Sequence, residues 1–226
     1  QARGDEEAVA EQLRVLQVIP ESQPHREWAE PILDELGKYK RDTKWKLTIA
    51  EELVVRGQSA EAIDLLSSTD AYAAGDVRVL VVVAEAQLSM RDVEAATATL
   101  DVALKNDPNH AMVHFELGNL ALLQSQWQNA AEHYGEAVRL QNSLGLAHYN
   151  LAICRQQLGD QDGAISAFEH ACRFMPQDVQ ARLILGELLR RVGRQEEGLK
   201  HLQLAAALAP NDPQVRNLIQ QTRRTP

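Results

Sequence analysis

The sequence predicts an all-α fold in which antiparallel helix pairs stack into an α–α superhelix. Three observations lead to this prediction. The 226-residue chain repeats itself with a period of 34 residues. Small residues recur at two fixed positions of every repeat. Only 4% of the residues are aromatic, whereas Ala, Leu, Gln and Glu, which lose little rotamer freedom in a helix, are plentiful.

Five repeats follow one another in phase over residues 43–212, and we number the positions of each repeat from 1 to 34. The repeats are 43–76, 77–110, 111–144, 145–178 and 179–212. Positions 8 and 20 carry only Ala or Gly, namely Ala50, Ala84, Gly118, Ala152 and Gly186, then Ala62, Ala96, Ala130, Ala164 and Gly198. Small side chains let two helices cross closely. Each repeat is therefore expected to contain two helices that pack at these positions.

Turn residues recur between the expected helices. Position 15 carries Gly57, Gly159 and Gly193, and position 32 carries Pro108, Pro176 and Pro210. A Gly at position 15 suits the C-terminal cap of the first helix, and a Pro at position 32 separates one repeat from the next. The pattern predicts a helix–turn–helix unit that is repeated five times.

On these residues the chain resembles the tetratricopeptide repeat (TPR) family, whose 34-residue units have small residues at positions 8, 20 and 27 and Pro at position 32. Residues 145–178 match the family pattern best. The resemblance implies a right-handed solenoid of antiparallel helix pairs. The chain departs from the pattern where Ala74 and Asn142 replace the Pro and where Thr69 occupies position 27. The first repeat ends in the irregular segment STDAYAAGD, and its second helix is expected to be short.

The two ends of the chain do not complete a repeat. Residues 213–226 begin a sixth repeat and are expected to form a C-terminal capping helix with a polar outer face. Residues 1–42 do not fit the phase and are expected to form a degenerate helical pair, or cap, over about 5–19 and 25–40. The alternative is that residues 1–42 belong to a further domain upstream.

The resemblance implies that positions 2, 5, 9 and 12 of each first helix line a groove for a partner. The expected groove residues, which include neighbours of these positions, are Leu47, Val81, Phe115, Asn119, Leu122, Tyr149, Asn150, Ile153, Leu183, Arg190, Arg191 and Arg224. The groove would be apolar in repeats 1–3 and basic toward the C-terminus. Exposed apolar surface marks interaction sites. The alternative is that neighbouring repeats cover these side chains.

A subset of TPR proteins grips the carboxylate of a bound peptide, and the sequence allows a check of that chemistry. Asn119 and Asn150 occupy the two Asn positions of such a clamp. However, Phe115, Gln180 and Ile184 stand where basic residues are needed. A carboxylate clamp is not expected, and the Asn pair would either hydrogen-bond a ligand backbone or be solvated.

No catalytic, cofactor or metal site is expected, because the chain has no phosphate-binding loop, nucleophile elbow or zinc motif. His114 and His148 share position 4, but stacked repeats would hold them roughly 10 Å apart, too far for a shared metal ion. Cys154 and Cys172 are expected to be small core residues rather than a disulfide.

The sequence therefore predicts a non-enzymatic scaffold or adaptor that binds a protein or peptide, either an amphipathic helix or an apolar segment with an acidic end near the arginines. The alternatives are a regulatory or substrate-recruiting module of a larger enzyme and a self-associating assembly domain. The net charge of −9 argues against nucleic acid, and no apolar run approaches the ~20 residues of a membrane helix. We expect a soluble protein, but the sequence does not decide the compartment, which is either the cytoplasm or, if Gln1 follows a cleaved signal peptide, the periplasm.

Overall fold

The computed structural model describes residues 43–213 and residue 215. The chain divides into two compact units, Gln1–Trp45 and Lys46–Pro226. The helical pair expected within residues 1–42, most of the capping helix expected at 213–226, and Arg224 lie outside the described residues.

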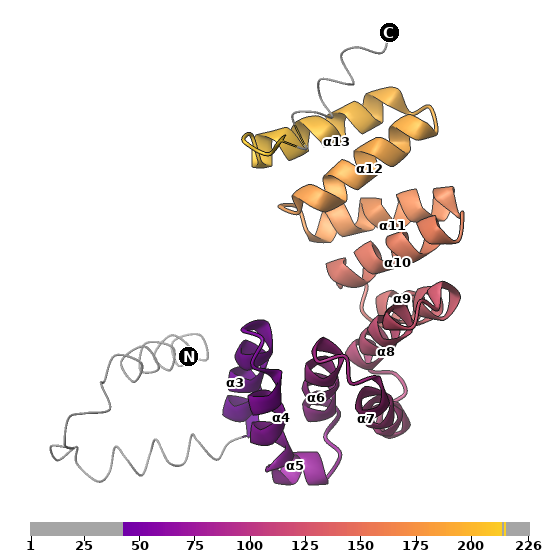
Figure 1. Ribbon diagram of the computed structural model, residues 1–226. Helices are drawn as coiled ribbons and strands as arrows, with labels where there is room; N and C mark the ends of the chain where they lie inside the picture. Colours follow the sequence, from indigo (N-terminus) through magenta and orange to yellow (C-terminus); the bar gives the residue numbers. More distant parts are fainter. Residues whose placement is uncertain (1–42, 214, 216–226) are drawn as a thin grey trace, which may run out of the picture. The chain divides into compact units, whose positions relative to one another are not determined.

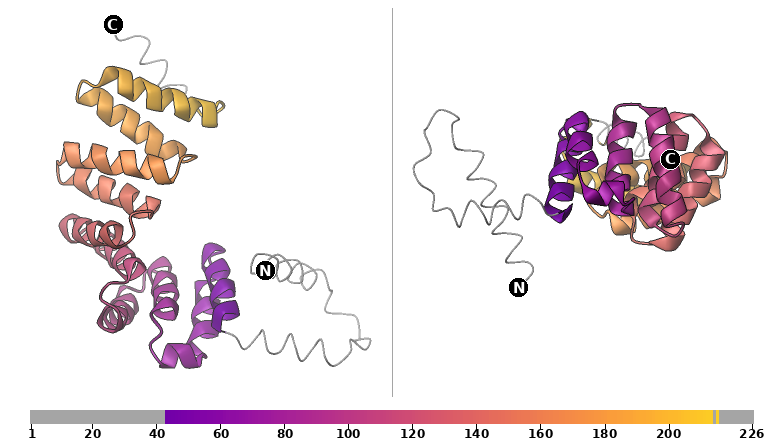
Figure 2. Two further views of the ribbon diagram at one scale, coloured as in Figure 1. Left: turned by 180° about the vertical axis from the view of Figure 1, so that it is seen from behind. Right: turned by 90° about the horizontal axis from the view of Figure 1, so that it is seen from below.

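The described residues form five helix pairs that follow one another in chain order (Figures 1 and 2). The pairs are α3 (Thr43–Val55) with α4 (Ser59–Ser67), α6 (Val77–Ser89) with α7 (Val93–Asn106), α8 (Ala111–Leu123) with α9 (Trp127–Leu140), α10 (Gly145–Gln157) with α11 (Gln161–Phe174), and α12 (Val179–Arg191) with α13 (Gln195–Leu208). Every first helix begins 34 residues after the previous one, and so does every second helix. An all-α repeat fold is confirmed for the described residues.

The small residues at positions 8 and 20 lie where the two helices of a pair cross. A Cβ atom at Gly118 of α8 would lie 2.6 Å from Cε1 of Tyr134 on α9. A Cβ atom at Gly198 of α13 would lie 2.6 Å from the carbonyl oxygen of Gly186 on α12. Real side chains do not approach so closely, so Gly is required at both crossings.

The turn inside every pair contains one residue with a left-handed backbone. The five residues at position 15 all have positive φ: 77° at Gly57, 61° at Arg91, 59° at Ser125, 82° at Gly159 and 87° at Gly193. The N–H of the next residue then donates to the carbonyl five residues back, as in Asp160 N–H to Arg155 O at 2.9 Å. The expected Gly caps are confirmed. Arg91 and Ser125 adopt the same conformation, which costs an L-residue about 1 kcal/mol or more.

The first repeat is interrupted at Thr69. Its hydroxyl donates to the Leu66 carbonyl at 2.6 Å and accepts the Tyr72 N–H at 3.0 Å. Thr69 is thus the N-cap of a separate short helix, α5 (Asp70–Ala73), instead of continuing α4. The expectation of a short second helix in this repeat is confirmed.

Helix α6 is the most continuously apolar first helix. Its buried side chains are Val79, Leu80, Val81, Val82, Val83, Ala84, Ala86 and Leu88. The helix contacts α4, α7 and α8, so more than one face of it is covered. A helix enclosed in this way needs apolar residues around most of its circumference.

Candidate functional site

Three of the expected groove residues are buried. Leu47, Val81 and Leu183 are 9%, 6% and 3% exposed. Each belongs to an apolar cluster between helices; Leu183, for example, packs with Leu202 and Val215. These three residues, at position 5 of repeats 1, 2 and 5, were expected to line the groove. The structure corrects this expectation, because their side chains pack inside the protein, among apolar side chains of adjacent helices.

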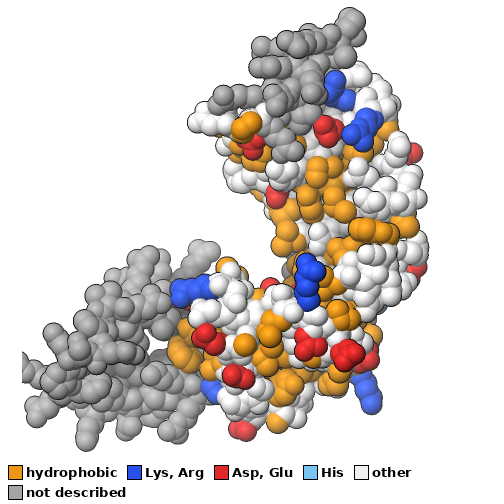
Figure 3. Space-filling view, in the orientation of Figure 1, with side chains coloured by type: hydrophobic (Ala, Val, Ile, Leu, Met, Phe, Trp, Pro, Cys, Tyr) orange, Lys and Arg blue, Asp and Glu red, His pale blue; other side chains and the backbone are white. Residues whose placement is uncertain are grey.

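Four other expected residues keep accessible surface on two adjacent first helices. Phe115 and Leu122 on α8, and Tyr149 and Ile153 on α10, are half-buried against the core of repeats 3 to 5. We call these four residues the α8/α10 face. The Phe115 ring lies 5.7 Å from the Tyr134 ring, centroid to centroid. Figure 3 shows hydrophobic side chains gathered over the described helices on the side of the molecule that it displays.

A hydrogen-bonded network lies behind this face and contains both Asn residues. The Tyr134 hydroxyl donates to Asn119 Oδ1 at 2.5 Å and accepts from Asn150 Nδ2 at 3.2 Å. Asn119 Nδ2 in turn donates to Glu116 Oε2 at 3.0 Å. The network joins α8, α9 and α10. Both Asn side chains, which were expected to bind a ligand backbone or to be solvated, have hydrogen-bond partners within the protein.

Glu116, at the end of this network, was not anticipated as a site residue. Its side chain is on α8 and is only 2% exposed. Burial, with a smaller contribution from the charge of Glu85, raises the pKa of the Glu116 carboxyl to about 7, while the Asn119 hydrogen bond opposes the shift. One sequence signal could have drawn attention to Glu116. Position 6 is uncharged in the other four repeats, at Thr48, Val82, Asn150 and Ile184.

Glu85 lies nearby on α6 and, like Glu116, forms no ion pair with the described residues. Burial raises the pKa of the Glu85 carboxyl, and the charge of Glu51 raises it further. None of the ion pairs among the described residues involves Glu51, Glu85 or Glu116. Three successive first helices thus contribute carboxylates that have no ion-pair partner in the described part of the chain.

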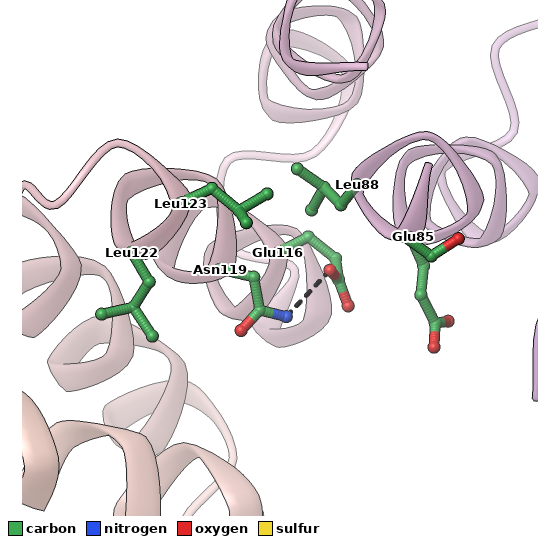
Figure 4. A pocket seen from close by; sticks show the side chains of 7 residues that line it. Glu85, Leu88, Glu116, Asn119, Leu122 and Leu123 are labelled. Carbon is green, nitrogen blue, oxygen red and sulfur yellow. Dashed lines mark hydrogen bonds between the residues drawn. The ribbon is translucent and has the colours of Figure 1, made fainter. Parts of the chain in front are cut away.

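Glu85 and Glu116 line a surface pocket of about 420 Å³ between α6 and α8. Its lining consists of Glu85, Leu88, Ser89, Glu116, Asn119, Leu122 and Leu123. We call it the Glu116 pocket. Figure 4 shows Glu85 and Leu88 extending from α6 beside Glu116, Asn119, Leu122 and Leu123 of α8. Its volume is in the range of small-ligand sites, and its lining combines leucines with two carboxylates.

The expected basic end of the groove is described in part. Arg190 is half-buried, and Arg191 is exposed. Together with Glu187 and Gln195 they line a smaller pocket of about 180 Å³, where Arg190 Nε donates to Gln195 Oε1 at 3.3 Å.

The cysteines and histidines take part in packing. Cys154 and Cys172 are free and buried, and burial raises the pKa of each thiol to about 11, so both are protonated at neutral pH. His148 stacks on His170 and Phe174, with ring centroids 5.0 and 5.6 Å away. Nδ1 of His114 lies 3.4 Å from Nδ1 of His133. In the described part of the chain, no group of three or more His, Cys, Asp or Glu side chains could hold a metal ion.

Comparison with known proteins supports the repeat assignment. The protein-family model of the tetratricopeptide repeat matches residues 81–145, 115–177 and 172–213, which together span more than half of the chain. No curated protein sequence matches. None of the described helices has the length and apolar character needed to cross a membrane.

Several solved structures share the fold. A crystal structure of MamA protein has a TM-score of 0.58 at 19% identity, covering 76% of this chain and 92% of that one. MamA 41-end from Desulfovibrio magneticus RS-1 has a TM-score of 0.60 at 21% identity, covering 75% and 96%. The APC/C hetero-tetramer Cut9–Hcn1 has a TM-score of 0.67 at 17% identity, covering 79% of this chain and 36% of that one. Such low identities establish a common fold alone.

Proposed function

The chain belongs to the tetratricopeptide-repeat family, and we propose that it is a scaffold that binds a segment of a partner protein across the α8/α10 face. Protein–protein interaction is the typical role of this family. The partner segment we propose is an amphipathic helix or an extended apolar peptide, because either presents a row of apolar side chains to a groove.

The observation that carries this proposal is the accessible apolar surface that two successive repeats share. Phe115, Leu122, Tyr149 and Ile153 are half-buried rather than buried, unlike Leu47, Val81 and Leu183 at equivalent or related positions. Leu146 at position 2 of α10 adds a side chain that is 58% exposed. The four side chains of the α8/α10 face pack against one apolar cluster from successive repeats, and accessible apolar surface of this kind marks interaction sites on proteins in water.

The internal hydrogen bonds make this surface suited to binding. The contacts of Tyr134 with Asn119 and Asn150 hold α8, α9 and α10 together behind the face. Tyr149 is held with its ring edge-on to Phe168, at 5.5 Å and 81°. A surface that is already ordered loses little conformational entropy when a partner docks.

The test begins with a random peptide-display library selected on the full chain, followed by affinity measurements on enriched peptides by fluorescence anisotropy. Replacing Phe115→Gln and Tyr149→Gln together removes the two largest apolar contacts. We expect enriched peptides to bind this variant at least about tenfold more weakly, because buried aromatic anchors dominate such interfaces.

The matched control replaces two exposed apolar residues of second helices, Val102→Gln on α7 and Leu204→Gln on α13, which are 46% and 49% exposed. The control should change affinity less than about twofold, since surface residues outside a contact contribute little. Circular dichroism would establish that both variants keep their helices. The proposal would be contradicted if both variants lost peptide affinity equally, or if neither lost any.

A further inference from the structure

We propose that the Glu116 pocket receives a lysine or arginine side chain of the protein segment that binds the α8/α10 face. This inference rests on the proposed function and deepens it, because it names a charge that the partner must carry. Leu122 belongs to both the face and the pocket. A segment lying on the face therefore passes the mouth of the pocket.

The apolar part of the pocket fits the stem of such a side chain. Leu88 of α6 and Leu122 and Leu123 of α8 form this part of the lining. Leu123 is 44% exposed, so it is free to be covered by a partner. Lysine and arginine bury their methylene groups along apolar surface while the cationic end reaches polar groups.

The acidic part of the pocket fits the cationic end. Glu116 is 2% exposed, and the single hydrogen bond that its side chain makes with the described residues is accepted by Oε2 from Asn119. Its Oε1 therefore has no hydrogen-bond donor among those residues. Glu85 on the opposite wall of the pocket is half-buried, and no cationic residue lines the pocket.

A positively charged ligand would remove an electrostatic cost that the free protein bears. Burying a carboxylate is unfavourable unless a cation or several hydrogen-bond donors compensate it. The pKa values of Glu116 and Glu85 are raised, mainly by burial, and each carboxyl also experiences a neighbouring carboxylate. An ammonium or guanidinium group in the pocket would supply the missing compensation, whereas an acidic ligand would add a further repulsion.

This charge preference differs from the one expected from sequence, which placed an acidic end of the partner beside Arg190 and Arg191. The two pockets are on different repeats, so one segment could meet both charges along its length. A basic side chain at the Glu116 pocket would then fix where the segment sits on α8.

The experiment compares peptides selected on the wild-type chain with versions in which their Lys or Arg is replaced by norleucine or citrulline. Citrulline keeps the length of an arginine side chain, norleucine keeps the four-carbon stem of a lysine without its ammonium group, and both remove the charge. On the wild-type protein we expect the charged peptide to bind about tenfold more tightly or better, as for a hydrogen-bonded pair partly removed from water.

The same pair of peptides is then measured on Glu116→Gln, which keeps the shape of the side chain and its acceptor for Asn119. We expect this variant to lose most of the preference for the charged peptide and Glu85→Gln to lose part of it. Glu94→Gln, an equal charge change at an exposed site on α7, should preserve it. Circular dichroism of each variant would show that the helices are intact.

The outcomes separate this inference from the function on which it depends. If peptides bind through Phe115 and Tyr149 but charged and neutral versions bind alike, the Glu116 pocket does not select a cation and the inference is overturned. The same conclusion follows if Glu116→Gln and Glu94→Gln have equal effects. If no peptide binds the face at all, the proposed function fails and this inference fails with it.

Discussion

Helix α8 contacts its neighbours on two sides, and among the described residues its polar side chains are paired with those of a neighbouring helix on one side but not on the other. Toward α10, the polar side chains of Asn119, Tyr134 and Asn150 satisfy one another. Toward α6, the carboxylates of Glu116 and Glu85 have no cationic partner among the described residues and line an open pocket. At the junction with α10 the polar side chains are therefore paired with one another, whereas at the junction with α6 two buried or half-buried carboxylates have no cationic partner among the described residues.

This difference arises from very few residues. Positions 6 and 9 are Val82 and Glu85 in repeat 2, Glu116 and Asn119 in repeat 3, and Asn150 and Ile153 in repeat 4. The backbone pattern is the same in all three, because their helices begin at equivalent positions. A repeat fold can thus change the chemistry of one junction without changing the packing of the next.

The largest effect should be on the pH dependence of the free energy of unfolding, and it should arise from the Glu116 carboxyl at the junction between α6 and α8. The folded-state pKa of Glu116 is about 7, above the value of 4.5 in an unfolded chain. Its contribution to stability is therefore fully present below pH 4.5 and is lost as pH rises through about 7. We expect Glu116→Gln to raise the free energy of unfolding at pH 8 by up to roughly 3 kcal/mol relative to wild type.

Urea unfolding of both proteins at pH 5 and pH 8 measures this difference. Glu85 acts on the Glu116 carboxyl, Glu51 acts on Glu85, and the charge of Glu116 acts on the Tyr134 hydroxyl; Glu85, Glu51 and Tyr134 are common to both proteins. Their contributions should therefore largely cancel in the comparison. If the free energies of unfolding of variant and wild type differ by the same amount at both pH values, ionisation of Glu116 does not cause the difference.

A smaller effect, in the opposite direction, should follow from breaking the hydrogen bonds between α8, α9 and α10. Tyr134→Phe removes the hydroxyl that bonds both Asn119 and Asn150, and it leaves two amide groups without that partner. We expect the free energy of unfolding to fall by about 1–3 kcal/mol, the cost of an unsatisfied polar group. Tyr149→Phe is the control, because the Tyr149 hydroxyl forms no hydrogen bond with the described residues. Equal stability of the two variants would mean that the network does not support the face.

The smallest effect on the free energy of unfolding should come from the turns that follow α8 and α10. Ser125 in repeat 3 has a φ of 59°, whereas repeat 4 has Gly159 at the equivalent position with a φ of 82°. Ser125→Gly should raise the free energy of unfolding by about 0.5–1 kcal/mol, because glycine adopts this backbone without steric strain. Ser166→Gly, inside α11, should lower it by about the same amount. Thermal unfolding of both variants would reveal whether the signs are opposite.

The sequence predicts the repeat architecture because its signals are local. Ala or Gly at positions 8 and 20 determines where two helices cross, and position 15 determines where each first helix ends. Even so, Arg91 and Ser125 show that a turn can keep a left-handed residue without Gly. Here the packing of the two flanking helices outweighs a strain of about 1 kcal/mol or more.

The candidate site could be predicted only in part, because it depends on contacts between repeats. The family pattern places Leu47, Val81 and Leu183 on the ligand side, but side chains of adjacent helices cover them. Conversely, Glu116 and Glu85 are 31 positions apart and form one pocket only because α6 and α8 are in contact. No local pattern in the sequence shows that Tyr134 reaches both Asn119 and Asn150.

Hydrogen exchange of the full chain, with and without a selected peptide, is the most direct test of binding across the α8/α10 face. A partner that covers this face should slow amide exchange in α8 and α10 and leave α7 and α11 little changed. Protection confined to the second helices, with α8 and α10 unaffected, would contradict the assignment of this face as the binding surface.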